Sequence, residues 1–139
     1  MSNFAKQVLA FQRKAELAMT ATLKEAAQDL SEQANTSRFK QSGNTPVDTG
    51  FLINSFNGDL NSIPTGEDTA PKGFKKTDYD AGPVLLAINK VKLGDRLVLG
   101  WTANYAQRME EKYSFARLAA QNWVPICEAA AKRVRRAIR

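Results

Sequence analysis

The chain contains no histidine and a single cysteine, Cys127, among its 139 residues. Without histidine there is no Ser-His or Cys-His relay and no zinc site with a histidine ligand. A single cysteine excludes an internal disulfide framework and fits a reducing compartment. Cys127 falls on an apolar helical stripe, so we interpret it as a small core residue. Any catalytic mechanism would have to use carboxylate, lysine or tyrosine side chains.

The acidic residues do not form a reactive pattern. Asp78 and Asp80 flank one tyrosine, and this segment is too short for the converging oxygens of a hard-metal site. Glu110 and Glu111 are adjacent, and nothing in the sequence places two acids across a cleft as a hydrolase requires. We therefore expect a protein that is not an enzyme and has no catalytic residue, metal site or cofactor.

Long apolar runs are also missing. No run approaches the roughly 20 residues needed to span a bilayer, and the segment MSNFAKQVLAFQRK lacks the apolar stretch of a secretory signal. We expect no membrane contact and a cytosolic location. The hydrophobic fraction of 43% and the charged fraction of 24% are ordinary for a globular protein. The length fits a single domain over residues 1–139.

The net charge of +6 is concentrated at the end of the chain. The ending KRVRRAIR has no acid and contains Lys132, Arg133, Arg135, Arg136 and Arg139. Such a cluster is a candidate for contact with DNA phosphates or with an acidic partner. The favoured interpretation is that these cations complement the negative end of a helix and keep it soluble. No aromatic residue lies among the arginines to stack on bases, so we expect no specific DNA recognition.

A long amphipathic helix is predicted over residues 3 to about 34. Apolar residues recur there at steps of three and four: Phe4, Val8, Phe11, Ala15, Met19, Leu23, Ala26 and Leu30. This spacing places them on one helical face. Ser2 or Asn3 is expected to cap the first turn.

Residues 35–44 are polar and small, and we interpret them as a mobile connector. After them, Asp48 and Thr49 are expected to cap a short helical turn that carries Leu52 and Phe56. The alternative role for these two residues is to hold the backbone of a partner.

In the middle of the chain, the sequence patterns for secondary structure differ in strength from segment to segment. Residues 56–63 suggest a strand, although their apolar alternation is weak. Residues 64–82 form a polar loop, expected to be flexible and either functional or disordered. Residues 83–93 fit a buried strand or a helix, and Pro83 with Gly94 favours the helix. Residues 96–101 are the best strand, with Leu97, Leu99 and Trp101 on one side.

A terminal helix is predicted to begin near Pro125, with Asn122 as its cap. Its apolar stripe consists of Trp123, Ile126, Cys127, Ala130, Val134 and Ile138. The predicted architecture therefore contains a long helix near each end of the chain and a small sheet between them.

Three segments in order carry a resemblance to a known family. They are TPVDTGFL at 45–52, LGWTANYAQRMEE at 99–111 and AAQNWVPICEAAAKR at 119–133. Together with the long first helix, they resemble the tail-completion proteins, a neck or minor tail component of long-tailed, lambda-like bacteriophages. The chain departs from that pattern after Glu110, where Glu111 and Lys112 follow and the family often has a glycine.

The resemblance implies an α+β domain with a small antiparallel sheet packed against the long N-terminal helix and the C-terminal helix. It implies a structural virion protein that completes or joins the head-proximal end of the tail, in a ring matching the tail's sixfold symmetry. The implied partners are other neck and tail proteins: the stopper or connector, the tail terminator or the tail tube. The implied location is the virion tail or neck, with the host cytoplasm as the site of assembly. Two alternatives stay open: a tail-terminator ring subunit and a small basic DNA-binding module.

Candidate interface residues come from the motifs of this resemblance. They are Asp48, Thr49, Phe51, Trp101, Asn104, Tyr105, Arg108 and Glu110. For Trp101 and Tyr105, core packing at the end of the strand is the favoured alternative. Arg108 and Glu110 suit an ion pair between subunits or simply a solvated helical face.

Overall fold

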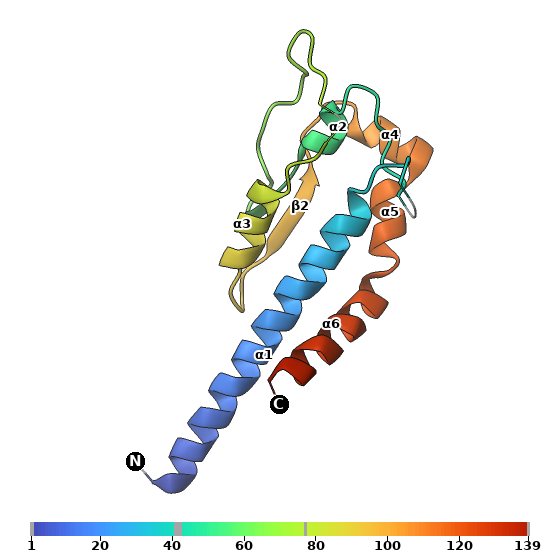
Figure 1. Ribbon diagram of the computed structural model, residues 1–139. Coiled ribbons are helices and arrows are strands. Elements are labelled where there is room, and N and C mark those ends of the chain that lie inside the picture. Colours follow the sequence, from blue (N-terminus) through green and yellow to red (C-terminus); the bar gives the residue numbers. More distant parts are fainter. Residues whose placement is uncertain (1, 41–42, 77, 139) are drawn as a thin grey trace.

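The computed structural model describes residues 2–40, 43–76 and 78–138. Its elements in chain order are α1 (Asn3–Ala34), α2 (Phe51–Asn54), β1 (Phe56–Leu60), α3 (Gly82–Lys90), β2 (Leu97–Trp101), α4 (Ala106–Tyr113), α5 (Phe115–Ala120) and α6 (Trp123–Ala137). The fold is α+β, as expected, with a long N-terminal helix, a C-terminal helix and a small antiparallel sheet. Helix α6 runs back along the second half of α1, while the sheet and α3 lie on another side (Figure 1).

Helix α1 begins after Ser2, one of the two predicted caps. The Ser2 hydroxyl accepts a hydrogen bond from the Ala5 amide at 3.2 Å. The buried residues of α1 all lie in its last turns: Ala26, Ala27, Ser31 and Ala34. The first part of the helix therefore extends away from the rest of the protein, towards the N-terminus in Figure 1.

The sheet consists of β1 paired antiparallel with β2, in a register that places Phe56 opposite Trp101 and Leu60 opposite Leu97. Helix α3 packs on the sheet through Val84 and Ile88, which are fully buried. Leu97, Leu99 and Trp101 pack against this cluster, so the predicted strand face is confirmed. The predicted strand over 56–63 ends earlier, at Leu60.

The structure also confirms the helical interpretation of residues 83–93, with different bounds. Helix α3 ends at Lys90, and the following residue, Val91, already has extended backbone. Gly94 lies in the turn before β2 with a φ of +95°, a conformation that favours glycine. Its role is thus to turn the chain into the strand rather than to end the helix.

The expectation of a mobile connector at 35–44 is wrong at its borders. Asn35 is buried, and Thr45, directly after the segment, is fully buried. The Thr45 hydroxyl donates to the Ala34 carbonyl at 2.8 Å, and the Thr45 amide donates to the Thr36 carbonyl at 3.1 Å. These contacts fasten the chain to the end of α1. Residues 41 and 42 lie outside the described residues.

The polar loop at 64–82 is hydrogen-bonded to the rest of the fold at several points. The Asp68 carbonyl accepts from the Asn104 amide at 2.8 Å, and the Lys76 amide donates to the Thr49 carbonyl at 2.8 Å. The Tyr79 hydroxyl donates to the Phe56 carbonyl at 3.1 Å. Burial raises the pKa of Tyr79 to about 12, with a smaller contribution from the charge of Asp80.

Candidate docking surfaces

The predicted caps of the short helix are wrong. Helix α2 begins after Gly50, whose φ of 87° places it in the left-handed region, and no side chain caps the helix in the usual way. The Thr49 hydroxyl accepts only a long hydrogen bond, at 3.4 Å, from the Phe51 amide. Phe56, expected on this helix, begins β1 instead. The Asp48 side chain is exposed and available to a partner.

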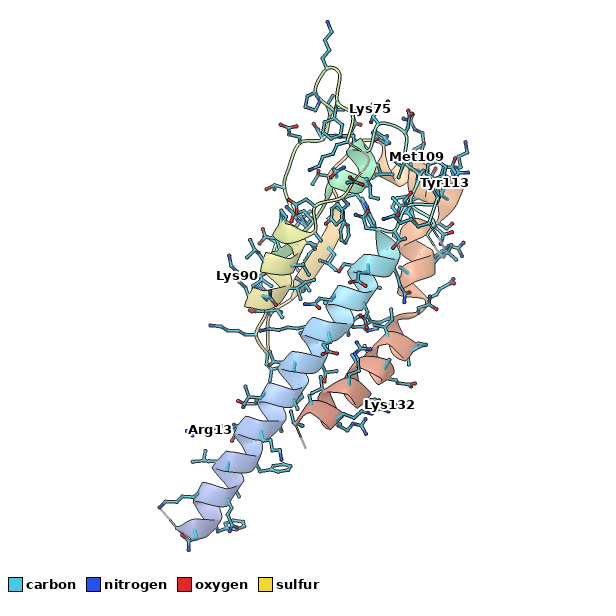
Figure 2. All side chains as sticks on the ribbon, in the orientation of Figure 1. Arg13, Lys75, Lys90, Met109, Tyr113 and Lys132 are labelled. Atoms are coloured by element: carbon cyan, nitrogen blue, oxygen red, sulfur yellow. The ribbon has the colours of Figure 1, made fainter. Side chains whose placement is uncertain are left out.

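Four of the predicted interface residues gather at the end of the molecule opposite the N-terminus, and we call them the head surface: Asp48, Asn104, Tyr105 and Arg108. Asp48 and Tyr105 line one groove of about 270 Å³. Tyr105 also lines a shallow depression with Asn104 and Arg108. Burial raises the pKa of the Tyr105 hydroxyl, and the charge of Asp48 acts in the same direction. Met109 and Tyr113, labelled in Figure 2, line the first groove too.

Two other predicted interface residues lie beneath this surface, Phe51 buried in the core and Trp101 half-buried against it. Phe51 is 5% exposed and packs edge-on against Phe74, with ring centroids 5.4 Å apart. Trp101 packs edge-on against Phe115 at 4.7 Å. Its indole nitrogen donates to the Asn35 side-chain oxygen at 2.9 Å. Both aromatic residues support the surface from within.

Glu110 has an intramolecular role that the sequence did not indicate. Its carboxylate accepts from the Ala116 amide at 2.7 Å and from the Arg117 amide at 3.2 Å. These amides belong to the first turn of α5, where the unpaired N–H groups of a helix need acceptors. An ion pair between Glu110 and Arg108 of another subunit would have to compete with these bonds. Ser114, with a φ of 54°, makes the sharp turn that brings α5 back to the carboxylate.

The basic end of α6 is partly neutralised within the chain. Arg133 forms salt bridges with Glu25 at 2.7 Å and with Asp29 at 2.6 Å, both on α1. The hydrogen bond to Glu25, followed by that to Asp29, raises the pKa of Arg133. The neighbouring cations Lys132, Arg135 and Arg136 are exposed, and Arg139 lies outside the described residues. Arg133 therefore helps to fix α6 on α1.

The same two helices leave an apolar surface uncovered. We call it the α1 stripe and define it as Phe4, Val8, Phe11, Ala15 and Met19. Phe4 and Phe11 are each 75% exposed, Met19 is 58% exposed and Val8 is 48% exposed. In Figure 2 the side chains of this part of α1, near the labelled Arg13, point into open space. The sequence showed these residues on one face, but not that Phe4, Val8 and Phe11 stay exposed in the described chain. The unequal lengths of the two helices could have indicated this exposure. Helix α1 has 32 residues and α6 only 15, so α6 cannot cover the whole of α1.

Two features are absent from the described residues: a cluster of three metal-ligating side chains and a membrane-spanning helix. Within 2–40, 43–76 and 78–138, no three histidine, cysteine, aspartate or glutamate side chains are placed to hold a metal ion together. In the same ranges, no helix combines the length and the apolar character that a membrane crossing requires. Comparisons of the chain with protein-family models, with curated proteins and with solved structures find no match.

Proposed function

We propose that this chain is a non-enzymatic structural subunit that completes or joins the head-proximal end of the tail of a long-tailed bacteriophage. The proposal combines the ordered motifs of the tail-completion family with the two surfaces described above. The observation that carries it is the α1 stripe, an apolar surface on a helix that projects beyond its own fold. A helix of this kind suits a protein that acts by fitting onto others.

Exposure of the α1 stripe has an energetic consequence. A phenylalanine ring covers roughly 200 Å², and Phe4 and Phe11 are each 75% exposed. Covering one of them would contribute roughly 1 to 2 kcal/mol, because complete burial of a phenylalanine side chain contributes about 1.5 to 3 kcal/mol, and the cost of association is still to be subtracted. Burial of these rings against a neighbouring protein would therefore make a favourable contribution to the free energy of binding.

A ring also requires two different surfaces on each subunit, because head-to-tail contacts are heterologous. The α1 stripe and the head surface lie at opposite ends of the molecule (Figure 1). The head surface is polar, with Asp48, Asn104 and Arg108 exposed. We propose that these two surfaces contact neighbouring subunits or the adjoining neck and tail proteins in the virion.

Complementation of a phage that lacks this chain tests the proposal. Its absence should yield filled heads and separate tails in electron micrographs. Wild-type chain and the Leu17→Asp variant should restore virions, because Leu17 is 73% exposed but lies on the face of α1 away from the stripe. Phe11→Asp should restore few or none. Normal virions without the chain would contradict the proposal, and tails of uncontrolled length would favour the tail-terminator alternative.

The DNA-binding alternative is less well supported. Arg133 is engaged by Glu25 and Asp29, so the exposed cations of this cluster among the described residues are Lys132, Arg135 and Arg136. We expect no retention of duplex DNA at physiological salt. Micromolar affinity for DNA that falls steeply as salt is added would favour a nucleic-acid-binding module instead.

A further inference from the structure

We infer that the α1 stripe of one free subunit pairs with the α1 stripe of a second copy, forming a weak antiparallel dimer. This inference rests on the proposed function, since it names the partner that covers the docking surface before assembly. A neck or tail protein would then replace the second copy in the virion.

Most of the α1 stripe lies beyond the part of α1 that α6 covers. Helix α6 packs on α1 through Ile126 and Ala130, which bury Ala26. Its last turns, with Val134 and Arg135, lie beside Ala18, Met19 and Thr22 of α1. Figure 1 shows that α1 extends past the end of α6. At about 100° per residue, the stripe lies on the same face of α1 as Ala18, Thr22 and Ala26. A second helix laid on the stripe would thus extend the line of α6.

The spacing along the stripe identifies the kind of partner. Four residues of the stripe, Phe4, Val8, Phe11 and Ala15, follow one another at steps of four, three and four residues, and Ala18 continues this spacing three residues further on. This heptad spacing keeps one seam turned towards another helix. Lys6 and Arg13 lie on the opposite face of α1, because successive residues turn by about 100°. The seam itself carries no charge, so an uncharged seam is its natural complement.

The sizes of the seam residues favour an antiparallel second copy. The large side chains Phe4 and Phe11 lie at one end of the seam, and the small Ala15 lies at the other. An antiparallel pair places Phe4 opposite Ala15 of the second copy and Val8 opposite Phe11. A parallel pair would place phenylalanine against phenylalanine and alanine against alanine, and the alanine layers would then be underpacked. The end of α6 beside Ala18 stops the two helices from sliding further along each other.

The exposed apolar area of the α1 stripe limits the affinity of the dimer. Phe4 and Phe11, each 75% exposed, together present roughly 300 Å². Val8, 48% exposed, adds to this area, and the total lies within the range that monomers usually expose. A stable interface buries about 800 Å² per partner. The stripe falls short of that area, so we expect a dissociation constant in the micromolar range and a dimer that a better partner can displace.

Sedimentation equilibrium of the full chain from about 1 to about 200 µM tests the inference. Wild type should shift from monomer to dimer within this range. Phe11→Asp should raise the dissociation constant by about tenfold or more, whereas Leu17→Asp should change it less than about twofold. Leu17 is a matched control because it is as exposed as Phe11 and lies on the same helix. A wild type that stays monomeric, or equal effects of the two variants, would overturn the inference.

Spin labels distinguish the two orientations. Labels at Asn3→Cys, in a chain that also carries Cys127→Ser, would lie roughly 20 Å apart in the antiparallel dimer, given about 1.5 Å of rise per residue. A parallel dimer would bring them to about 10 Å, the spacing of packed helices. A measured separation near the smaller value would refute the antiparallel arrangement.

The dimer and the virion role can fail separately. A monomeric wild type that still restores virions would overturn the dimer and leave the proposed function intact. If the wild type dimerises as described but loss of its gene leaves virions normal, the dimer would stand and the proposed function would be overturned. Binding of a monomeric wild type to vesicles of anionic phospholipid would overturn the inference by assigning the stripe to a membrane surface.

Discussion

Replacing Asn35 by alanine should lower the free energy of unfolding by roughly 2 to 5 kcal/mol. Asn35 follows the end of α1 and is 6% exposed. Its side-chain nitrogen donates to the Ile53 carbonyl at 2.9 Å, and its side-chain oxygen accepts from the Trp101 indole at 2.9 Å. One amide thus joins α1, α2 and β2. The expected loss is large because total stability is typically about 5 to 15 kcal/mol.

The magnitude follows from the groups that the substitution leaves behind. Alanine removes both bonds of Asn35, so the Ile53 carbonyl is stranded in a buried site and the Trp101 N–H in a partly buried one. The buried Ile53 carbonyl should cost about 1 to 3 kcal/mol and the partly buried Trp101 N–H about 1 to 2 kcal/mol, which together give roughly 2 to 5 kcal/mol. An exposed amide near the same helix end provides the control. Gln33 accepts from Asn122 at 3.2 Å in an exposed pair, so Gln33→Ala should cost less than about 0.5 kcal/mol.

Urea unfolding followed by tryptophan fluorescence measures both variants, since Trp101 reports directly on the site. A loss below about 0.5 kcal/mol for Asn35→Ala would refute the reasoning, because it would mean that water or another group satisfies the two partners as well as the amide does.

The isosteric variant Asn35→Asp adds a dependence on pH. It keeps the acceptor for Trp101 but loses the donor for Ile53 unless the introduced carboxyl is protonated. Burial should raise the pKa of that carboxyl above its unfolded value of about 3.9. Its contribution to stability is therefore complete below that value and is lost as the pH rises through the folded pKa. The deficit relative to wild type should be smaller at acidic pH than at neutral pH. A deficit that does not change between the two would contradict this account.

Three further predictions concern the core, the loop and the cap of α5. Ile88→Ala should lower the free energy of unfolding by about 2 to 5 kcal/mol, because Ile88 is 0% exposed; Leu86→Ala, at a site 62% exposed, should cost under about 1 kcal/mol in the same urea titration. Tyr79 should ionise at a pH of about 12 in ultraviolet absorbance titrations. Because folding raises the pKa of Tyr79, its contribution to stability is complete below the ordinary pKa near 10 and is lost as the pH rises towards 12. An ordinary titration of Tyr79 would show that its hydroxyl is not buried. Glu110→Ala should lower the free energy of unfolding by about 0.5 to 2 kcal/mol, because it removes the acceptor for the first amides of α5. The control variant Glu111→Ala should change thermal unfolding little. Equal losses of stability in the two variants would argue against the cap.

The helices and the better strand were predictable because their signals are local. The stripe from Phe4 to Leu30 has helical spacing without interruption, and α1 runs from Asn3 to Ala34. The strand face of Leu97, Leu99 and Trp101 follows from alternation over neighbouring residues. The caps were less predictable. Ser2 does cap its helix, but Asn122 makes no side-chain cap and donates to Gln33 instead.

The candidate surfaces were predictable only in part. The motif residues Asp48, Asn104, Tyr105 and Arg108 come from distant segments, and the fold places them at one end of the molecule. The sequence could not show that Phe51 belongs to the core beneath them, since a short helix with little periodicity does not reveal which of its faces is buried.

By itself the sequence determined the type and approximate length of the main elements, because backbone propensity and apolar periodicity act between residues a few positions apart. Tertiary structure alone decided which part of the α1 face is covered, because the covering element is a shorter helix that begins about ninety residues after the end of α1. It also decided that Arg133 binds Glu25 and Asp29, and that Asn35 joins Ile53 to Trp101. Contacts of this kind depend on how the elements pack, which local spacing does not encode.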